Sequence, residues 1–296
     1  MIVALGDLML DILVRSSSFV LHGTDCTVQA SISPGGSAAN FATWAARLGA
    51  EVGLIAKVGD DLLGHALLHD LEREKVINGV AVGRETTGFT LMILDQAGKR
   101  TMLAARGANA TLSSDELDWK LLDRAHWLHL TAYSFFEEKP RKAALAAIQY
   151  VKRRGKPVSL DPSSVSYLQG IGPAAFFTLT KGVDVLFPNL EEGQILTGES
   201  EPERILHALL RHFPMVALKM GGDGAIAGDG NTIAYHPGFA VPIVDTTGAG
   251  DAFAAAFVVT WLTCHDLAAA LREGNRIAAG VVQAPGARAT AAPPVP

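Results

Sequence analysis

Residues 244–253, VDTTGAGDAF, combine a glycine turn, a carboxylate and the start of an apolar run. The small residues at 248–250 (GAG) allow backbone N–H groups to converge on an anion, and 252–261 (AFAAAFVVTW) read as a helix. A small-residue turn that opens a helix favours negative charge, because the first N–H groups are unpaired and the helix dipole adds to them. Asp251 would repel such an anion unless it takes a proton from a nucleophile there, which is our hypothesis for this residue. The alternative is that Asp251 only caps the helix.

The composition predicts a folded protein with a large hydrophobic core. Hydrophobic residues make up 49% of the 296 residues, and charged residues make up only 19%. The length fits one large α/β domain with an appendage, or two modest domains. A net charge of −5 gives no electrostatic footprint for nucleic acid, so we expect no nucleic-acid partner and only a local phosphate site.

No targeting or membrane segment is expected from the sequence. The first apolar run is broken by Asp7 and Asp11 and lacks a basic leader, so it reads as a buried strand and not as a signal peptide. No run reaches ~18 uninterrupted apolar residues, which argues against a membrane span. Cys26 and Cys264 form no CxxC motif, which argues against a zinc site or a disulfide framework. We therefore expect a cytoplasmic protein with two buried, reduced thiols.

A small satellite sheet is predicted from two separated segments. Residues 9–14 continue the first apolar strand away from the core, and 86–101 read as a hairpin around the turn 96–98. Such a sheet would suit a lid over a site. Its open edges favour a homodimer through the lid sheet. The lid strands are expected at about residues 11–32 and 86–104.

Polar residues near the N-terminus are candidate ligands. Asp11 lies inside an apolar run, where a carboxylate is costly unless it binds something or faces water. Gly35 and Gly36 form a sharp turn, which implies close approach of a helix or a ligand. Asn40 falls in the first turn of a helix predicted over 38–48, where it faces a bound polyol or merely caps.

From residue 125 the chain alternates short apolar runs with helical segments. This alternation is typical of parallel βαβ units, in which ligands bind at the carboxyl ends of the strands. Polar and glycine clusters follow several of these strands, which places them at that edge. The predicted strands of this part cover residues 126–130, 157–160, 183–187, 216–220 and 225–227, and an earlier strand is predicted over 51–57.

Two motifs give a family resemblance. PGGSAANFA at 34–42 and DTTGAGDAF at 245–253 occur in this order, with PNLEE (188–192) and KMGGDG (219–224) between them. Together they resemble the two signatures of the ribokinase-like (PfkB) carbohydrate kinase family, and the match covers nearly the whole chain. The resemblance implies a single domain over 1–296, a three-layer α/β/α fold with a mostly parallel central sheet and a small β-sheet lid.

The resemblance also implies roles for individual residues. Asp251 matches the catalytic base, and Lys219 contacts a phosphate or is a solvated surface lysine. ATP would be the phosphate donor, with Mg²⁺ as cofactor and a possible K⁺. The matched positions are Gly248, Ala249 and Gly250 for the anion hole; Asp11, Gly35, Gly36 and Asn40 for the sugar hydroxyls; Gly221, Gly222, Gly224 and Asn275 for the nucleotide; Asn189 and Glu192 for Mg²⁺, through water; and Asp245, Thr247 and Gly286 for a monovalent cation.

The leading functional hypothesis is transfer of the γ-phosphate of ATP to a primary hydroxyl of a small sugar or sugar acid. Several departures from ribokinases concern the acceptor: Met9 and Ser37 replace a polar residue and a lysine, and 131–133 (TAY) lack an acidic residue. A nucleoside kinase therefore remains an alternative, with Tyr133 or Phe89 stacking on a base. A non-catalytic sugar-binding regulator is a second alternative. A dinucleotide-binding oxidoreductase is excluded, because the first strand leads into GDLMLD and not GxGxxG.

Overall fold

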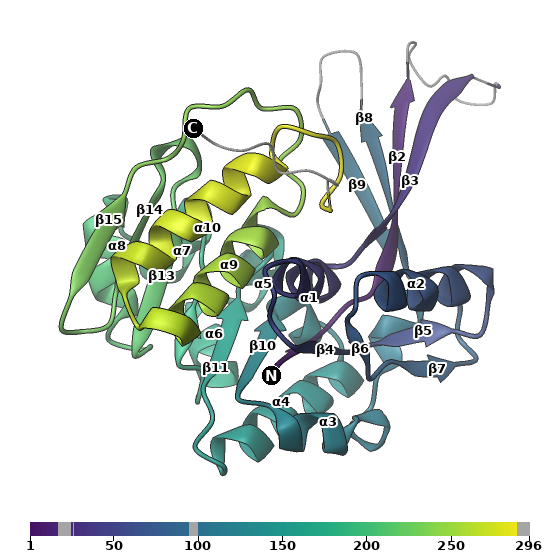
Figure 1. Cartoon of the computed structure of the whole chain (residues 1–296), viewed down its shortest axis with the longest axis horizontal. Coiled ribbons are helices and arrows are strands. Elements are labelled where there is room, and N and C mark those ends of the chain that lie inside the picture. Colours follow the sequence, from purple (N-terminus) through teal and green to yellow (C-terminus); the bar gives the residue numbers. More distant parts are fainter. Residues whose placement is uncertain (17–24, 26, 95–99, 289–296) are drawn as a thin grey trace.

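The computed structural model describes residues 1–296 except 17–24, 26, 95–99 and 289–296. Within these residues, nine strands form a central sheet in the order β15-β14-β13-β12-β11-β10-β1-β4-β6 (Figure 1). The pairs from β6 to β13 are parallel, whereas β14 and β15 are added antiparallel at one edge. The strands are β1 (Ile2–Leu5), β4 (Val52–Ile55), β6 (Ile77–Asn78), β10 (Trp127–Thr131), β11 (Val158–Asp161), β12 (Val185–Leu186), β13 (Met215–Lys219), β14 (Ala225–Gly228) and β15 (Ile233–His236).

Helices cover both faces of this sheet, because its strands are apolar on both sides. In β1, Ile2 and Ala4 pack in one core and Val3 and Leu5 in the other. The predicted three-layer α/β/α fold is thereby confirmed. One layer holds α1 (Ser37–Arg47), α2 (Leu62–Arg73), α9 (Ala249–Cys264) and α10 (Leu267–Val281); the other holds α3 (Trp119–Arg124), α4 (Glu138–Lys152), α5 (Val165–Ile171), α6 (Pro173–Leu179), α7 (Leu190–Thr197) and α8 (Pro202–Leu209).

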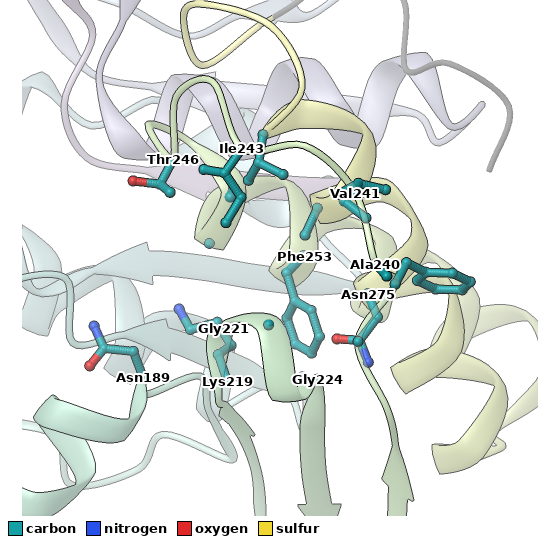
Figure 2. A pocket seen from close by; sticks show the side chains of 18 residues that line it. Asn189, Lys219, Gly221, Gly224, Ala240, Val241, Ile243, Thr246, Phe253 and Asn275 are labelled. Carbon is teal, nitrogen blue, oxygen red and sulfur yellow. The ribbon is translucent and has the colours of Figure 1, made fainter. Parts of the chain in front are cut away.

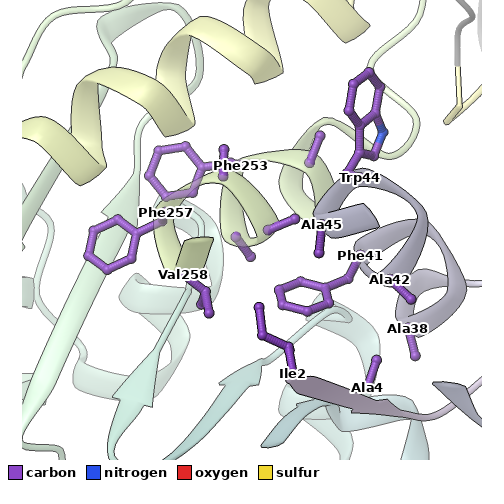
Figure 3. Packing of buried hydrophobic residues seen from close by; sticks show 14 of the residues in the cluster. Ile2, Ala4, Ala38, Phe41, Ala42, Trp44, Ala45, Phe253, Phe257 and Val258 are labelled. Carbon is purple, nitrogen blue, oxygen red and sulfur yellow. The ribbon is translucent and has the colours of Figure 1, made fainter. Parts of the chain in front are cut away.

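Helix α9 is the central helix of its layer. Its residues from Ala252 to Val258 are all buried, because α1 and α10 pack beside it over the sheet. Figure 3 shows Phe253 and Phe257 of α9 in the same core as Phe41 of α1 and Ile2 of β1. Small alanines on both helices allow this close packing. The packing fixes the N-terminus of α9 over the sheet.

A second, four-stranded sheet projects from one edge of the layers (Figure 1). Its order is β3-β2-β8-β9, with β2 and β8 parallel and the outer pairs antiparallel. In the strand register, Asp11, Thr90 and Ala104 lie side by side on one face, so they point in the same direction. The turn predicted at 96–98 lies outside the described residues. The strands are β2 (Met9–Ser16), β3 (Val28–Gly35), β8 (Phe89–Leu94) and β9 (Arg100–Ala105).

Two details of the sequence prediction were wrong. The strand predicted over 51–57 divides after Ile55, and β5 (Lys57–Gly59) pairs with β7 (Ala81–Gly83) in a separate small sheet. Lys57 pairs with Ala81 in that small sheet, and its amine forms ion pairs with Glu85 and Glu116. Cys264 is exposed because it ends α9 at the surface, so the expected buried pair of thiols does not form; Cys26 lies outside the described residues.

Among the described residues, none of the helices has the length and apolar character needed to cross a bilayer. Short 3₁₀ turns lie at Gly107–Thr111, Ser114–Glu116, Ala132–Phe135 and Gly221–Asp223.

Candidate active site

Two joined cavities lie at the carboxyl ends of the central strands, where ligands bind in parallel α/β sheets. The first, which we call the polar cavity, has a volume of about 610 Å³ and lies between the four-stranded sheet and the N-terminus of α9. The second, the apolar cavity, has a volume of about 480 Å³ and extends along α9 and α10 (Figure 2). The two share Asn189, Lys219, Thr246 and Gly250.

The lining of the two cavities differs in chemistry. The polar cavity carries several carboxylates and two cations, whereas aliphatic and aromatic side chains dominate the apolar one. Polar-cavity side chains include Asp7, Asp11, Asn40, Thr90, Arg106, Tyr133, Phe136, Asp161, Glu192 and Asp251. Apolar-cavity side chains include Phe239, Val241, Ile243, Phe253, Ala279 and Val282.

Asp251 lies in the first turn of α9, at the junction of the cavities. Gly248 is the N-cap residue, and it adopts the left-handed conformation (φ 75°) that a side chain disfavours. The Asp251 carboxylate does not cap the helix: it accepts a hydrogen bond from the Ser37 hydroxyl on one oxygen and from Asn40 Nδ2 on the other, at 2.9 Å. The capping interpretation of Asp251 was therefore wrong.

The environment of Asp251 raises its pKa to about 7. Burial is the largest cause, and the neighbouring Asp161 carboxylate adds to it, while the bonds from Ser37 and Asn40 oppose the shift. Near pH 7 such a carboxyl group is close to half ionised, which suits a general base.

The start of α9 can also hold an anion. Among the described residues no side chain caps this helix. The Ala249 N–H donates to the Thr246 carbonyl at 3.3 Å, and Gly250, the next residue, lines both cavities. Gly250 has no side chain, and a Cβ there would lie only 3.1 Å from the Lys219 amine. Ala249 and Gly250 line the apolar cavity, and Gly248 and Gly250 line the polar one. A phosphate group would meet backbone donors and a cation at this point.

Lys219 ends β13 and faces the carboxylate that ends β11. Its amine donates to Asp161 Oδ2 at 2.5 Å, and its side chain is only 15% exposed, so the interpretation as a solvated surface lysine was wrong. Burial alone would lower the pKa of Lys219, but the charges of Asp161 and Glu192 raise it above its ordinary value. Lys219 therefore carries a positive charge between the two cavities.

Asn189 and Glu192 form a capping box at the start of α7. Asn189 Oδ1 accepts from the Glu192 N–H at 2.9 Å, and the Asn189 N–H donates to Glu192 Oε2 at 2.8 Å. Burial and the charge of Asp161 raise the pKa of Glu192 to about 7, while Lys219 opposes the shift. No group of three or more His, Cys, Asp or Glu in the described part of the chain could hold a metal ion directly. Asn189 and Glu192 both line the polar cavity, where an amide and a carboxylate are donors that suit a Mg²⁺ ion keeping its waters.

The predicted sugar-binding residues gather in the polar cavity. Asp11, Gly36 and Asn40 line it, and Gly35 lies behind Asp11, where a Cβ would overlap the Asp11 carboxylate. Burial raises the pKa of Asp11 to about 6, and the charge of Arg288 opposes this shift. The Asp11 carboxylate thus lies in the same cavity as Asp251, and Asn40 borders that cavity with its amide nitrogen bonded to Asp251.

The predicted nucleotide-binding residues line the apolar cavity. Gly221, Gly222 and Gly224 form the turn after β13, and Asn275 lies on α10 across the cavity (Figure 2). Gly224 has a φ of 91°, and a Cβ there would overlap the His236 carbonyl oxygen. The Asn275 amide donates to that same carbonyl at 2.9 Å.

The predicted cation loop lies outside both large cavities except for Thr247, which lines the polar one. Asp245 Oδ1 accepts from the N–H and hydroxyl of Thr247 at 3.0 and 2.7 Å, and Asp245 Oδ2 accepts from the Gly286 N–H at 2.9 Å. The loop before α9 is thereby tied to the segment after α10.

Four further residues of the site were missed from the sequence. Asp161 ends a predicted strand, so the carboxyl-end rule was the signal that could have found it. Asp7 and Arg106 line the polar cavity and form an ion pair at 2.7 Å, and Arg106 also pairs with Glu137. Arg288 contacts Asn40 from behind. No local pattern marks either arginine, because their partners are distant in sequence.

A three-layer fold with a half-buried carboxylate at the start of a helix whose first turn borders two cavities is an arrangement suited to small-molecule phosphotransferases. The profile of the pfkB family carbohydrate kinases matches residues 1–293. The chain therefore belongs to this family and is a carbohydrate kinase.

Individual relatives agree with this assignment. The chain is 35% identical to an ATP-dependent ribose-1-phosphate kinase of Halopiger xanaduensis, over 86% of this chain and 82% of the relative. It is 30% identical to a 2-dehydro-3-deoxygluconokinase of Bacillus subtilis, over 85% and 81% of the two chains. The structure of a putative ribokinase II from E. coli in complex with ATP and Mg²⁺ superposes with a TM-score of 0.86 at 26% identity, covering 97% of this chain and 94% of the other.

Proposed function

We propose that this chain transfers the γ-phosphate of ATP to a primary hydroxyl of a small sugar or sugar acid. The observation that carries the proposal is the position of Asp251. It lines the polar cavity and directly follows Gly250, which lines both cavities. ATP would occupy the apolar cavity with its phosphates toward Lys219, and the sugar would occupy the polar one. The E. coli relative solved with ATP and Mg²⁺ supports this choice of donor.

In the proposed reaction Asp251 takes the proton of the sugar hydroxyl. The hydroxyl oxygen forms a bond to the γ-phosphorus as the bond to the bridging oxygen of ADP breaks. The N–H groups of residues 248–250 and the Lys219 ammonium offset the charge on the transferred group, which is the main way phosphoryl transfer is stabilised. The proton stays on Asp251 until the phosphosugar leaves.

Mg²⁺ would neutralise the phosphate charge when bound, held through water near Asn189 and Glu192. A monovalent cation at the Asp245 loop is a separate part of the proposal. Rates of ADP release in potassium chloride and in tetramethylammonium chloride test it: a severalfold higher rate with potassium supports the site, and equal rates refute it.

The β3-β2-β8-β9 sheet is proposed as the lid of a single cytoplasmic domain, and as the surface of a homodimer. Its face away from the polar cavity carries a row of apolar residues in register, including Ile32, Ile12, Leu91 and Leu103. Ile32 is 67% exposed and Leu103 is 53% exposed, so a second copy would bury apolar area there. Light scattering of the double variant Ile32→Lys/Leu103→Lys should report a monomer; an unchanged mass would refute this interface.

An acceptor panel coupled to ADP release tests the proposed function. The panel should hold ribose, ribose 1-phosphate, fructose and 2-dehydro-3-deoxygluconate, with adenosine, inosine and cytidine as the competing class. ADP release that depends on one of the sugars supports the proposal. Failure with every acceptor would instead favour a non-catalytic sugar-binding regulator.

A nucleoside kinase is the second candidate, and one observation favours it. Tyr133 and Phe136 both line the polar cavity, with ring centroids 5.1 Å apart, so an aromatic base could stack there. Against it, Tyr133 donates to the Ser163 carbonyl and Phe136 stacks on Tyr167, which are structural contacts. A preference for nucleosides over sugars in the panel would decide for this candidate.

A further inference from the structure

Arg288 reaches the polar cavity from behind. It follows α10 at the end of the described chain, yet it is only 9% exposed. Its guanidinium makes three hydrogen bonds to three different elements. Nε donates to Asn40 Oδ1 at 2.8 Å, one terminal nitrogen donates to Asp70 Oδ2 at 2.8 Å, and the other donates to the Gly35 carbonyl at 3.1 Å.

The backbone that carries Arg288 is held at each of its last three described residues. Gly286 donates to Asp245, the Ala287 carbonyl accepts from Trp44 Nε1 at 3.0 Å, and the Arg288 carbonyl accepts from Arg47 at 3.1 Å. The guanidinium therefore approaches α1 from a fixed direction.

This contact determines which way the Asn40 amide points. An arginine side chain has only donors, so the Asn40 group that faces it has to be the oxygen. The amide nitrogen of Asn40 then faces the other way, where it donates to Asp251 Oδ2 at 2.9 Å. Asp70, Arg288, Asn40 and Asp251 form one continuous chain of hydrogen bonds.

We propose that Arg288 is a positioning residue for phosphoryl transfer, which orients Asn40 so that Asn40 holds the Asp251 carboxylate in its ionised, proton-accepting form. The inference rests on the proposed role of Asp251 as base. With Asn40 and Ser37 both donating, each oxygen of Asp251 accepts a hydrogen bond, and these bonds favour the charged form. Without Arg288 the amide of Asn40 is free to rotate, and one of the two donors is lost.

The buried ion pair has to be treated separately from the positioning role. Removing Arg288 alone would leave Asp70 as an uncompensated buried charge, which destabilises a fold strongly. The double variant Arg288→Met/Asp70→Asn removes both charges and also removes the donor to Asn40. Arg288→Lys keeps a positive charge near Asp70, but a single ammonium group cannot reproduce the fork that reaches both Asp70 and Asn40.

The test is the pH dependence of kcat in these variants, measured by ADP release at saturating sugar. We expect the acidic limb of the kcat–pH profile to move up by about one pH unit in both variants. A shift of this size corresponds to the free energy of one hydrogen bond to a carboxylate. kcat should fall severalfold at pH 7 and recover at higher pH, while the KM for ATP stays unchanged. Adding Asn40→Ala should produce no further shift, because both changes remove the same donor.

The control variants account for the charged and polar groups around both ends of the hydrogen-bond chain from Asp70 to Asp251. Asp251 is also influenced by Ser37, Asp161 and Lys219, and Arg288 faces Asp11, Asp70, Glu74 and Arg47. All of these except Asp70 are present in every variant, so the single variant Asp70→Asn controls for that change. Arg276→Met controls for loss of an arginine; Arg276 is on α10, pairs with Glu273 and lines neither large cavity. Both controls should keep the parent acidic limb.

Chemical rescue gives an independent readout. Arg288 and Asp70 line a further cavity of about 440 Å³, so guanidinium in the buffer has access to the space left in Arg288→Ala/Asp70→Asn, a variant without an uncompensated Asp70 charge. Rescue of kcat by guanidinium, and not by ammonium, supports the proposal. The role of Arg288 is overturned if the acidic limb of the kcat–pH profile stays unshifted in both Arg288→Lys and the double variant while Asp251→Asn is inactive. Asp251 would then still be the base. An active Asp251→Asn overturns the proposed base itself.

Discussion

Removal of the Ser37 hydroxyl should shift the pH at which the kinase becomes active. Ser37 donates to one oxygen of Asp251, and this bond lowers the pKa that burial has raised to about 7. A hydrogen bond to a charged group contributes roughly 1.5–3 kcal/mol. One pKa unit corresponds to about 1.36 kcal/mol, so Ser37→Ala should raise the pKa of Asp251 by about one to two units.

The direction in which the kcat–pH profile shifts follows from the role of Asp251 as the base. Asp251 acts when ionised, so activity is lost as the pH falls through its pKa, and a higher pKa moves this loss to higher pH. A shift of one unit reduces the ionised fraction at pH 7 from about a half to about a tenth, so kcat should fall about fivefold there. At about pH 9 the parent and this variant should differ much less.

The assay is kcat by ADP release over about pH 5.5 to 9.5, with the exposed Ser200→Ala as a matched control. Ser200→Ala should keep the parent profile. Coincident acidic limbs for Ser37→Ala and the parent would refute the reasoning, since Asp251 would then not depend on this donor.

Three further predictions concern the nucleotide side and the core. Lys219→Met should lower kcat by ~10²–10³-fold in the ADP-release assay, because it removes the cation between the two cavities; a change below tenfold would contradict this role. Gly224→Ala should abolish ATP binding in calorimetry, because its φ of 91° is unfavourable for alanine and a Cβ would overlap the His236 carbonyl; normal affinity would contradict it. Phe257→Ala should reduce the free energy of unfolding in urea by about 3–5 kcal/mol, because Phe257 is fully buried. The exposed Leu262→Ala should cost far less, and equal losses would argue against the core seen in Figure 3.

The layers of the fold were predictable because their signals are local. Alternating strands and helices after residue 125 gave the parallel sheet, and the two glycine motifs gave the family. The break before Lys57 was not predictable, because β5 pairs with β7, and the Lys57 amine there contacts Glu85 and Glu116. Glu116 is distant in sequence, so no pattern within residues 51–57 announces that contact.

The candidate site was predicted in part for the same reason. Asp251 and Asn40 lie in recognisable motifs, but the hydrogen bond between them joins residues 211 apart. Arg288 is separated by 248 residues from Asn40 and by 218 from Asp70. Only tertiary packing brings these groups together, so a single sequence marks the base without marking what positions it.

The Asp251→Asn variant tests the proposed role of Asp251 most directly. Asparagine keeps the shape of the side chain but cannot accept the proton, so kcat for the best sugar should fall by ~10²–10⁴-fold. ATP binding by calorimetry should stay close to that of the parent, because Asp251 does not line the apolar cavity. Turnover near the parent rate in a folded Asp251→Asn protein would contradict the role of Asp251 as the base.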